Sequence, residues 1–283
     1  MDKVDGDGVV AQVRGLEVPW GQLAVWALGQ HGYLLKGGRC VVIVDPYLSR
    51  YVEEITPGPK EGVARRVPIV ARPEELDMVD LALVTHHHAD HCDPRTLIPL
   101  MRAAQRARLV MSYSARDALV EAGAERGRIE VPPVDAAVDY GEGLRVTAIP
   151  AAHYEFEPDD QGNPSYLGFV VEMNGVVLYH AGDGVIYEGL VERLERHHID
   201  MACLPINGRD WFREQEGLVG NMDYREAADL AHRVGVKVLI AAHNDMFSGN
   251  RINPAYLLDY LEARYPEQRV QFPRAGELYY YAG

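Results

Sequence analysis

The sequence is poor in cysteine and has no long apolar run. Its three cysteines, Cys40, Cys92 and Cys203, are widely separated and odd in number, so they predict no disulfide framework and favour a reducing, cytoplasmic setting. No apolar run is long enough to span a bilayer, and the acidic start MDKVDGDG lacks the basic and apolar regions of a signal peptide. We therefore expect neither a membrane span nor a targeting segment.

Basic side chains are also scarce: 28 Lys and Arg stand against 42 Asp and Glu, for a formal net charge of -14. This charge repels phosphate backbones and acidic lipids, so neither nucleic acid nor a membrane is an expected partner. A small-molecule substrate is expected, and the sequence leaves open whether copies of the chain form a homo-oligomer. With 283 residues, 47% of them hydrophobic, and no linker or low-complexity tract, we expect one domain over residues 1–283.

Predicted strands and helices alternate along most of the chain. Residues 8–48 predict short antiparallel strands separated by turns, and β-α-β alternation follows. Asn174-Gly175 predicts a tight hairpin turn between two strands. The helix-end signals are Ser114 as an N-cap, Asp223 and Gly235 at the two ends of one helix, and Pro254 in the first turn of the last helix. The pattern predicts an α/β fold of two similar mixed halves around one core.

Metal-capable side chains follow four of the predicted strands. The stretch VTHHHADHCD, residues 84–93, comes directly after the apolar run VDLALV. The candidate ligands are His86, His88, Asp90 and His91 after this strand, and His153, Asp183 and His243 after three later strands. In layered α/β folds the carboxyl ends of strands open into the crevice where ligands bind, so these residues can converge. Nitrogen and oxygen ligands with an open water position make a catalytic metal site.

The spacing within the histidine-rich stretch predicts two neighbouring metal positions. His86 and His88 can point to one side, whereas Asp90 and His91 follow in the turn and can face a second position. A single histidine is more often a hydrogen-bonded structural residue than a ligand, and a histidine-rich tract can bind metal adventitiously. The string H-x-H-x-D-H, combined with three further strand-end ligands, is much more specific than either alternative.

The remaining histidines and Cys92 favour a structural interpretation. His87 is expected to point away from the metals, and His197 and His198 suit the C-terminus of a predicted helix. No ligand spacing involves His31, His180 or His232. Asn207 and Arg209 follow a strand end on the expected active-site side, where an arginine can hold a phosphate through two parallel hydrogen bonds. A solvated loop is the alternative for these two residues.

The segment HHHADH, residues 86–91, resembles the signature of the metallo-β-lactamase superfamily, and His153, Asp183 and His243 stand where that superfamily has its remaining ligands. The resemblance covers nearly the whole chain and implies a four-layer αββα sandwich with two divalent metal ions, Mn2+ or Zn2+, at one edge. It implies that one ion is held by His86, His88 and His153, and the other by Asp90, His91 and His243, with Asp183 as the bridge.

The resemblance also implies supporting and catalytic roles. Asp45 matches the superfamily's early aspartate, which supports a ligand loop from behind. A plain turn residue at the strand end is the alternative for Asp45. Asp90 would act catalytically as a proton shuttle beside the metals, and Asp183 by holding them together.

Four later segments, LYHAGDG, LPINGRDWF, GNMDYREAADLA and VLIAAHNDMFSGN, are similar to the branch that includes L-ascorbate-6-phosphate lactonase. This implies a hydrolase that opens a sugar lactone, phosphorylated or not, with metal-activated water. The chain departs from that enzyme in being shorter. A small-molecule phosphodiesterase is the enzyme alternative, and a non-catalytic metal-binding protein is the other. A diiron oxygen or nitric-oxide reductase is disfavoured, because it calls for a carboxylate at the position of His88 and a flavin domain.

Overall fold

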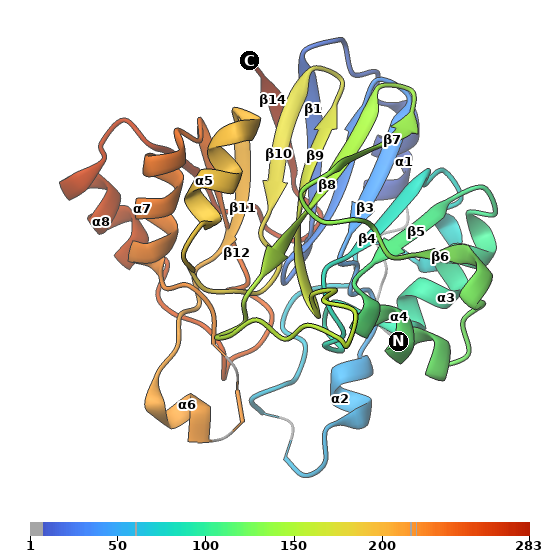
Figure 1. Ribbon diagram of the computed structural model, residues 1–283, viewed down its shortest axis with the longest axis horizontal. Helices are drawn as coiled ribbons and strands as arrows, with labels where there is room; N and C mark the ends of the chain where they lie inside the picture. Colours follow the sequence, from blue (N-terminus) through green and yellow to red (C-terminus); the bar gives the residue numbers. More distant parts are fainter. Residues whose placement is uncertain (1–7, 60, 216, 219) are drawn as a thin grey trace.

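The computed structural model describes residues 8–59, 61–215, 217–218 and 220–283. Within these residues, two mixed β-sheets pack face to face and helices cover the outer face of each (Figure 1). This is the expected four-layer αββα sandwich. No helix in the described part of the chain has both the length and the apolar character needed to cross a membrane.

Each sheet has seven described strands. The first sheet contains β1 (Gln22–Gly29), β2 (Gly32–Gly37), β3 (Cys40–Val44), β4 (Leu81–Val84), β5 (Arg108–Met111), β6 (Ile129–Glu130) and β14 (Leu278–Ala282). The second contains β7 (Ala137–Gly141), β8 (Leu144–Ala151), β9 (Tyr166–Met173), β10 (Val176–His180), β11 (Met201–Pro205), β12 (Val238–Ala242) and β13 (Arg269–Gln271). The α-helices are α1 (Val9–Gly15), α2 (Tyr51–Ile55), α3 (Pro94–Ala103), α4 (Tyr113–Glu121), α5 (Leu190–Leu194), α6 (Trp211–Gln215), α7 (Tyr224–Val234) and α8 (Ala255–Arg264). Short 3-10 helices are η1 (Pro73–Glu75), η2 (Arg126–Arg128) and η3 (Glu195–His197).

The two sheets are built alike. Strand order is β14-β1-β2-β3-β4-β5-β6 in the first and β13-β12-β11-β10-β9-β8-β7 in the second. In the first sheet, neighbouring strands from β1 to β3 pair antiparallel and those from β3 to β6 pair parallel. In the second sheet, neighbouring strands from β7 to β10 pair antiparallel and those from β10 to β13 pair parallel. The last strand, β14, leaves the second half and pairs antiparallel with β1, with Trp26 opposite Leu278. The chain end therefore joins the two halves.

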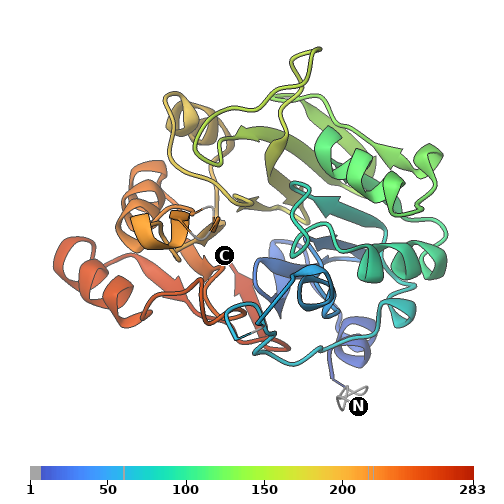
Figure 2. The same cartoon turned by 90° about the horizontal axis from the view of Figure 1, so that it is seen from below.

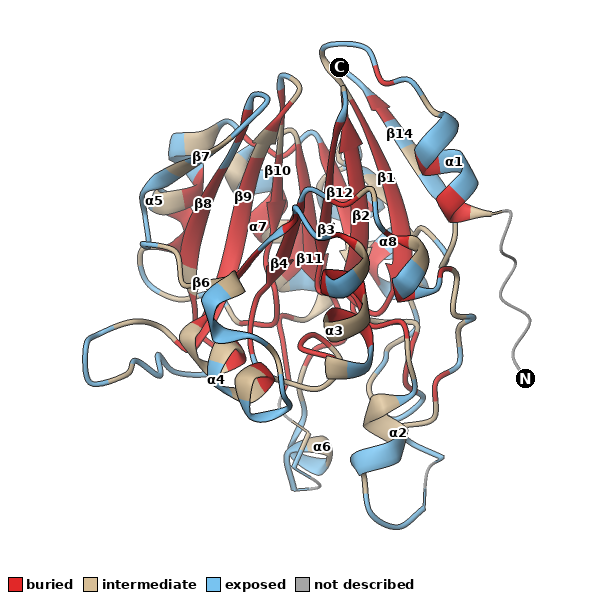
Figure 3. Cartoon of the chain, turned by 90° about the vertical axis from the view of Figure 1, so that its right-hand side faces the viewer, coloured by how far each residue is buried: buried red, intermediate tan, exposed pale blue. Residues whose placement is uncertain are grey.

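The main core lies between the sheets. Leu35 and Val42, paired across β2 and β3, are fully buried, and so are Phe169 and Ile240 of the second sheet. Figure 3 shows the buried strands in red behind helices whose outward faces are exposed. Since both faces of these strands are covered, their sequences are nearly continuous apolar runs.

Several local predictions are confirmed. Asn174 and Gly175 both have positive φ, 53° and 78°, as the tight hairpin turn between β9 and β10 requires. The Asp223 side chain caps α7 by accepting from the backbone N–H groups of Arg225 and Glu226, and Gly235 ends that helix with φ 76°.

Three helix starts differ from the prediction. Residues 9–15 form α1 and not a strand, because Val9 and Val13, one helical turn apart, share a buried face. The N-cap of α4 is Ser112, which accepts from the N–H of Ala115, whereas Ser114 donates its hydroxyl to the carbonyl of Ser165. Pro254 is the N-cap residue of α8 and lies just before its first turn.

Candidate metal centre

The candidate ligands all follow strands whose carboxyl ends meet at one end of the sandwich. His86, His88, Asp90 and His91 follow β4, His153 follows β8, Asp183 follows β10, and His243 follows β12. Helices α2 and α6 extend beyond the sheets at this end (Figure 1), and they lie in front when the molecule is seen from below (Figure 2). Because the sheets fix the strand ends, residues far apart in sequence are held at short distances.

Two ligand groups form at this end. The first ligand group consists of His86, His88, His153 and Asp183, and the second of Asp90, His91 and His243. Within each group, one ligand atom of every residue lies within 4.8 Å of the others. The structure therefore brings together all seven residues that the sequence analysis assigned to the metals, and it groups Asp183 with His86, His88 and His153.

Asp183, a member of the first ligand group, also lies close to two histidines of the second. Its Oδ1 is 3.3 Å from His91 Nε2, and its Oδ2 is 3.2 Å from His243 Nε2. The same Oδ2 is 3.8 Å from Nε2 of His153 in the first ligand group. One carboxylate thus faces histidines of both groups, the position that a bridging ligand needs.

The residues present fit divalent metal ions. Among the described residues, four buried polar atoms of the cluster have no hydrogen-bond partner: His91 Nε2, His153 Nδ1, Asp183 Oδ1 and His243 Nδ1. A buried polar atom without a partner costs free energy, and such atoms in native proteins call for an explanation such as a bound ion. Imidazole nitrogens and carboxylate oxygens suit zinc, manganese or iron.

Electrostatics supports the same conclusion. Burial lowers the pKa of His86 and His153 and brings that of His88 to about 4, so these imidazoles stay neutral with a lone pair to donate. Burial also acts on His243, but the carboxylates of Asp183 and Asp90 outweigh it and raise its pKa to about 9. The carboxylates of Asp90 and Asp183 therefore favour a positive charge beside them.

Asp45, the residue after β3, holds the ligand loop from behind. It accepts hydrogen bonds from His91 Nδ1 at 2.8 Å, from the Thr85 backbone N–H at 2.8 Å and from the Thr85 hydroxyl at 2.7 Å. Because the hydroxyl of Thr85 donates to Asp45, it accepts from His86 Nδ1, 2.9 Å away. Both histidines therefore carry their proton on Nδ1 and turn Nε2 toward the cluster.

Sequence reasoning missed the β1–β2 hairpin as part of the site. Gln30 donates from Nε2 to Asp90 Oδ2 at 2.6 Å, and the same nitrogen lies 3.0 Å from His243 Nε2. His31 places Nδ1 3.8 Å from Asp183 Oδ1, and its ring centroid lies 4.1 Å from that of His180, with the two rings tilted by 33°. The available signal was a polar pair, Gln30-His31, at the tight turn between two largely apolar strands.

Other residues lie outside the two groups. His87 is exposed, and Cys92 points its sulfur at the carbonyl of Ala115, 3.5 Å away. Arg209 forms a two-pronged pair with Glu226, with distances of 2.8 and 2.7 Å, and donates to the carbonyl of Asn221. Asn207 is buried and donates to Asn250. The structure therefore does not bring Arg209 or Asn207 to the metal cluster.

A pocket of about 550 Å³ opens onto the cluster. We call it the metal pocket; its floor includes His88, Asp90, His153, Asp183 and His243. Its walls come from the loop around α2, from residues 217–218 and from the segment after β12, with the apolar side chains Val52, Ile55, Val63, Leu218 and Phe247. None of the described residues that line it is a lysine or an arginine.

Known proteins are similar to this chain in sequence. The family model of the beta-lactamase superfamily domain matches residues 41–244. A metal-dependent hydrolase of Thermoplasma acidophilum is 31% identical over 218 residues, which cover 77% of this chain and 81% of the relative. Another, of Hyperthermus butylicus, is 28% identical over 254 residues, covering 89% and 96%.

Solved structures agree in fold. A metallo hydrolase of Ignicoccus hospitalis superposes with a TM-score of 0.66 at 19% identity, covering 92% of this chain and 98% of that one. An isothiocyanate hydrolase from Delia radicum gut bacteria superposes with a TM-score of 0.65 at 17% identity, covering 92% and 100%. At these identities the likeness concerns the fold.

Proposed function

The chain belongs to the beta-lactamase superfamily of metal-dependent hydrolases, and we propose that it opens the ester bond of a small lactone at the candidate metal centre. The observation that carries this proposal is the make-up of the metal pocket. Its floor combines histidine and aspartate ligands, and its walls are largely apolar. Such a pocket suits an electrophile that is polar at the reacting group and neutral elsewhere.

The two ligand groups would each hold one divalent ion. His86, His88 and His153 would bind the first, Asp90, His91 and His243 the second, and Asp183 both. When bound, such ions activate water at neutral pH and polarise the carbonyl group under attack.

Asp90 is the residue best placed to move a proton. It lines the metal pocket, and its side chain is 18% exposed while those of His91 and Asp183 are almost fully buried. Burial alone would raise its pKa, but His91 and His243 outweigh that effect and keep the carboxylate ionised. Gln30 fixes Oδ2 by a hydrogen bond. The Asp90 carboxylate would accept a proton from the attacking water and return it to the alkoxide that leaves, and its lowered pKa means that it holds this proton only transiently.

The lining of the metal pocket favours a neutral substrate over a phosphodiester. A phosphodiester carries its charge on the reacting group, and the described lining offers no arginine or lysine to meet it. The apolar side chains of Val52, Val63 and Phe247 instead suit the uncharged carbon skeleton of a neutral substrate. A lactone ring is neutral until it is opened.

The test is a rate comparison on metal-loaded protein with a panel of neutral lactones and a panel of phosphodiesters. We expect lactone hydrolysis by the wild type and by His87→Ala, whose exposed ring lies outside both ligand groups. Asp183→Asn should lower the rate by orders of magnitude while circular dichroism stays unchanged, because the charge that joins the ligand groups is lost. Faster phosphodiester turnover, or near-normal rates in Asp183→Asn, would refute the proposal.

A further inference from the structure

A second pocket lies against the metal cluster, on the other side of His243. It has a volume of about 470 Å³ and is lined by the β1–β2 hairpin, the residues after β12 and β13, and part of the segment before β4. His243 lines both this pocket and the metal pocket, and Gln30 lines this one. We call it the arginine pocket.

Three arginines from separate loops line the arginine pocket: Arg66, Arg251 and Arg274. All three are exposed, and none has a side-chain hydrogen bond or ion pair within the described residues. Several other arginines are paired, as Arg108 is with Glu130. Asp245 is the one carboxylate among the described lining residues, and its Oδ1 already accepts from the Gln30 backbone N–H at 2.9 Å.

Three unpaired cations thus line one concavity of a chain with a net charge of -14. Three guanidinium groups around one concavity repel one another unless an anion lies between them. Each guanidinium has a planar fork of donors that matches two oxygens of a carboxylate or a phosphate. From this we infer that the arginine pocket binds a small oxyanion.

Two classes of ligand carry an oxyanion of this kind. Opening a lactone converts a neutral ester into a carboxylate, so the acid product is one source, and it is the only one that rests on the proposed function. A phosphate group is the other, and it would take the role that the sequence analysis gave to Arg209. In either case the anion lies beside the metal cluster, because His243 lines both pockets and Gln30 Nε2 lies 3.0 Å from His243 Nε2.

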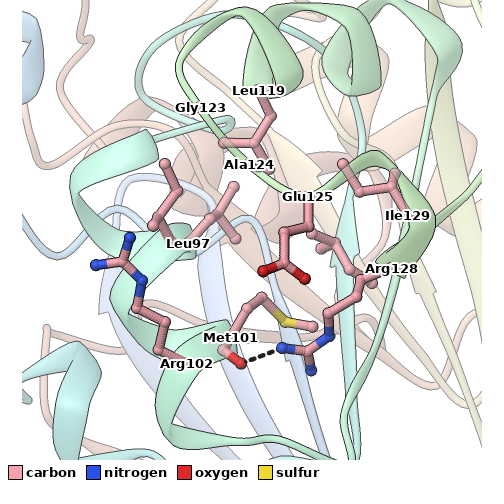
Figure 4. Close-up of a pocket in the computed structure, with 11 residues that line it drawn as sticks. Leu97, Met101, Arg102, Leu119, Gly123, Ala124, Glu125, Arg128 and Ile129 are labelled. Atoms are coloured by element: carbon pink, nitrogen blue, oxygen red, sulfur yellow. Dashed lines mark hydrogen bonds between the residues drawn. The ribbon is translucent and has the colours of Figure 1, made fainter.

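The smaller cavity in Figure 4 offers a contrast. It measures about 90 Å³ between α3, α4 and η2, and Leu97, Met101 and Leu119 give it an apolar lining. Arg128 there is occupied, since it donates to the carbonyls of Met101, Ala104, Gln105 and Ala107. Arg102 lines the same cavity, is exposed and has no side-chain hydrogen bond or ion pair among the described residues, which makes it a matched control.

Isothermal titration calorimetry on the metal-loaded protein tests the inference without any turnover. The probes are inorganic phosphate and, separately, gluconate as a hydroxy-carboxylate. We expect at least one of them to bind, and the triple variant Arg66→Gln, Arg251→Gln, Arg274→Gln to weaken that binding about tenfold or more. Arg102→Gln should bind as the wild type does. Which probe binds identifies the source of the anion.

Three results would overturn the inference: no binding of either probe, equal binding by the triple variant, or an equal loss in Arg102→Gln. Binding that survives in the triple variant would place the anion on the metals. Thermal unfolding of each variant checks that the substitutions at these exposed positions leave the fold intact. If the wild type binds the anion but hydrolyses no lactone, the inference about the arginine pocket stands and only the proposed function is refuted.

Discussion

His91 Nδ1 lies 2.8 Å from Oδ2 of Asp45, and both side chains are fully buried. This contact fixes the proton of His91 on Nδ1 and leaves Nε2 facing Asp183 and Asp90. Asp45 therefore acts on the metal cluster indirectly, by orienting the ring of the candidate ligand His91.

The first prediction concerns this contact. Asp45→Asn removes the charge that holds His91 and Thr85 in place, so affinity for the ion in the second ligand group should fall about 10- to 100-fold. A competition titration with a metal-chelating dye measures it. Asp139→Asn, an exposed carboxylate on β7, is the control. Unchanged metal affinity in Asp45→Asn would mean that the contact only shapes the turn after β3.

The second prediction concerns metal content and stability. The folded protein should bind two divalent ions per chain, and chelation should lower its thermal midpoint. An ion present at about 100 times its dissociation constant stabilises the folded state by about 2.7 kcal/mol. Elemental analysis and calorimetric scans with and without chelator measure both effects. Less than one equivalent of metal, with no uptake of added metal, would contradict the prediction.

The third prediction separates the two interpretations of Arg209. Because its guanidinium is paired with Glu226, Arg209→Ala should cost up to about 1 kcal/mol of stability, as partly exposed ion pairs do. Its Michaelis constants for a phosphorylated and an unphosphorylated lactone should stay equal to those of the wild type. Glu226→Gln, which removes the charge of the partner, should show the same small loss of stability and the same unchanged Michaelis constants. A rise confined to the phosphorylated lactone would restore the role that the sequence suggested.

The fourth prediction concerns the cysteines. Burial, with Asp80 nearby, raises the pKa of the Cys40 thiol to about 12, and burial raises the pKa of Cys92 and Cys203 as well. A raised pKa keeps the thiol protonated, and only the thiolate reacts. A thiol-reactive dye at pH 8 should therefore label none of the three in the native protein and all three after denaturation. Fast labelling of the native chain would show that one of these sites opens.

The sequence by itself determined the ligands and much of the local structure. The HHHADH stretch needs only its own spacing and the preceding apolar strand to predict a metal site, and Asn174-Gly175 fixes its turn through backbone conformation alone. These features depend on residues that are neighbours in the chain. The layered fold follows from the alternation of apolar strands with amphipathic helices.

Tertiary structure decided what depends on distant segments. The hydrogen bond from the Gln30 backbone to Asp245 joins residues 215 positions apart, and nothing near Gln30 in sequence indicates it. Arg209 lies in a loop that the sequence made a candidate for phosphate binding, but its guanidinium donates hydrogen bonds to Glu226 on α7 instead. β14 crosses to pair with β1, because the free edge of the first sheet was open to it. Side-chain partners are set by how the sheets and helices pack, and local patterns do not encode that packing.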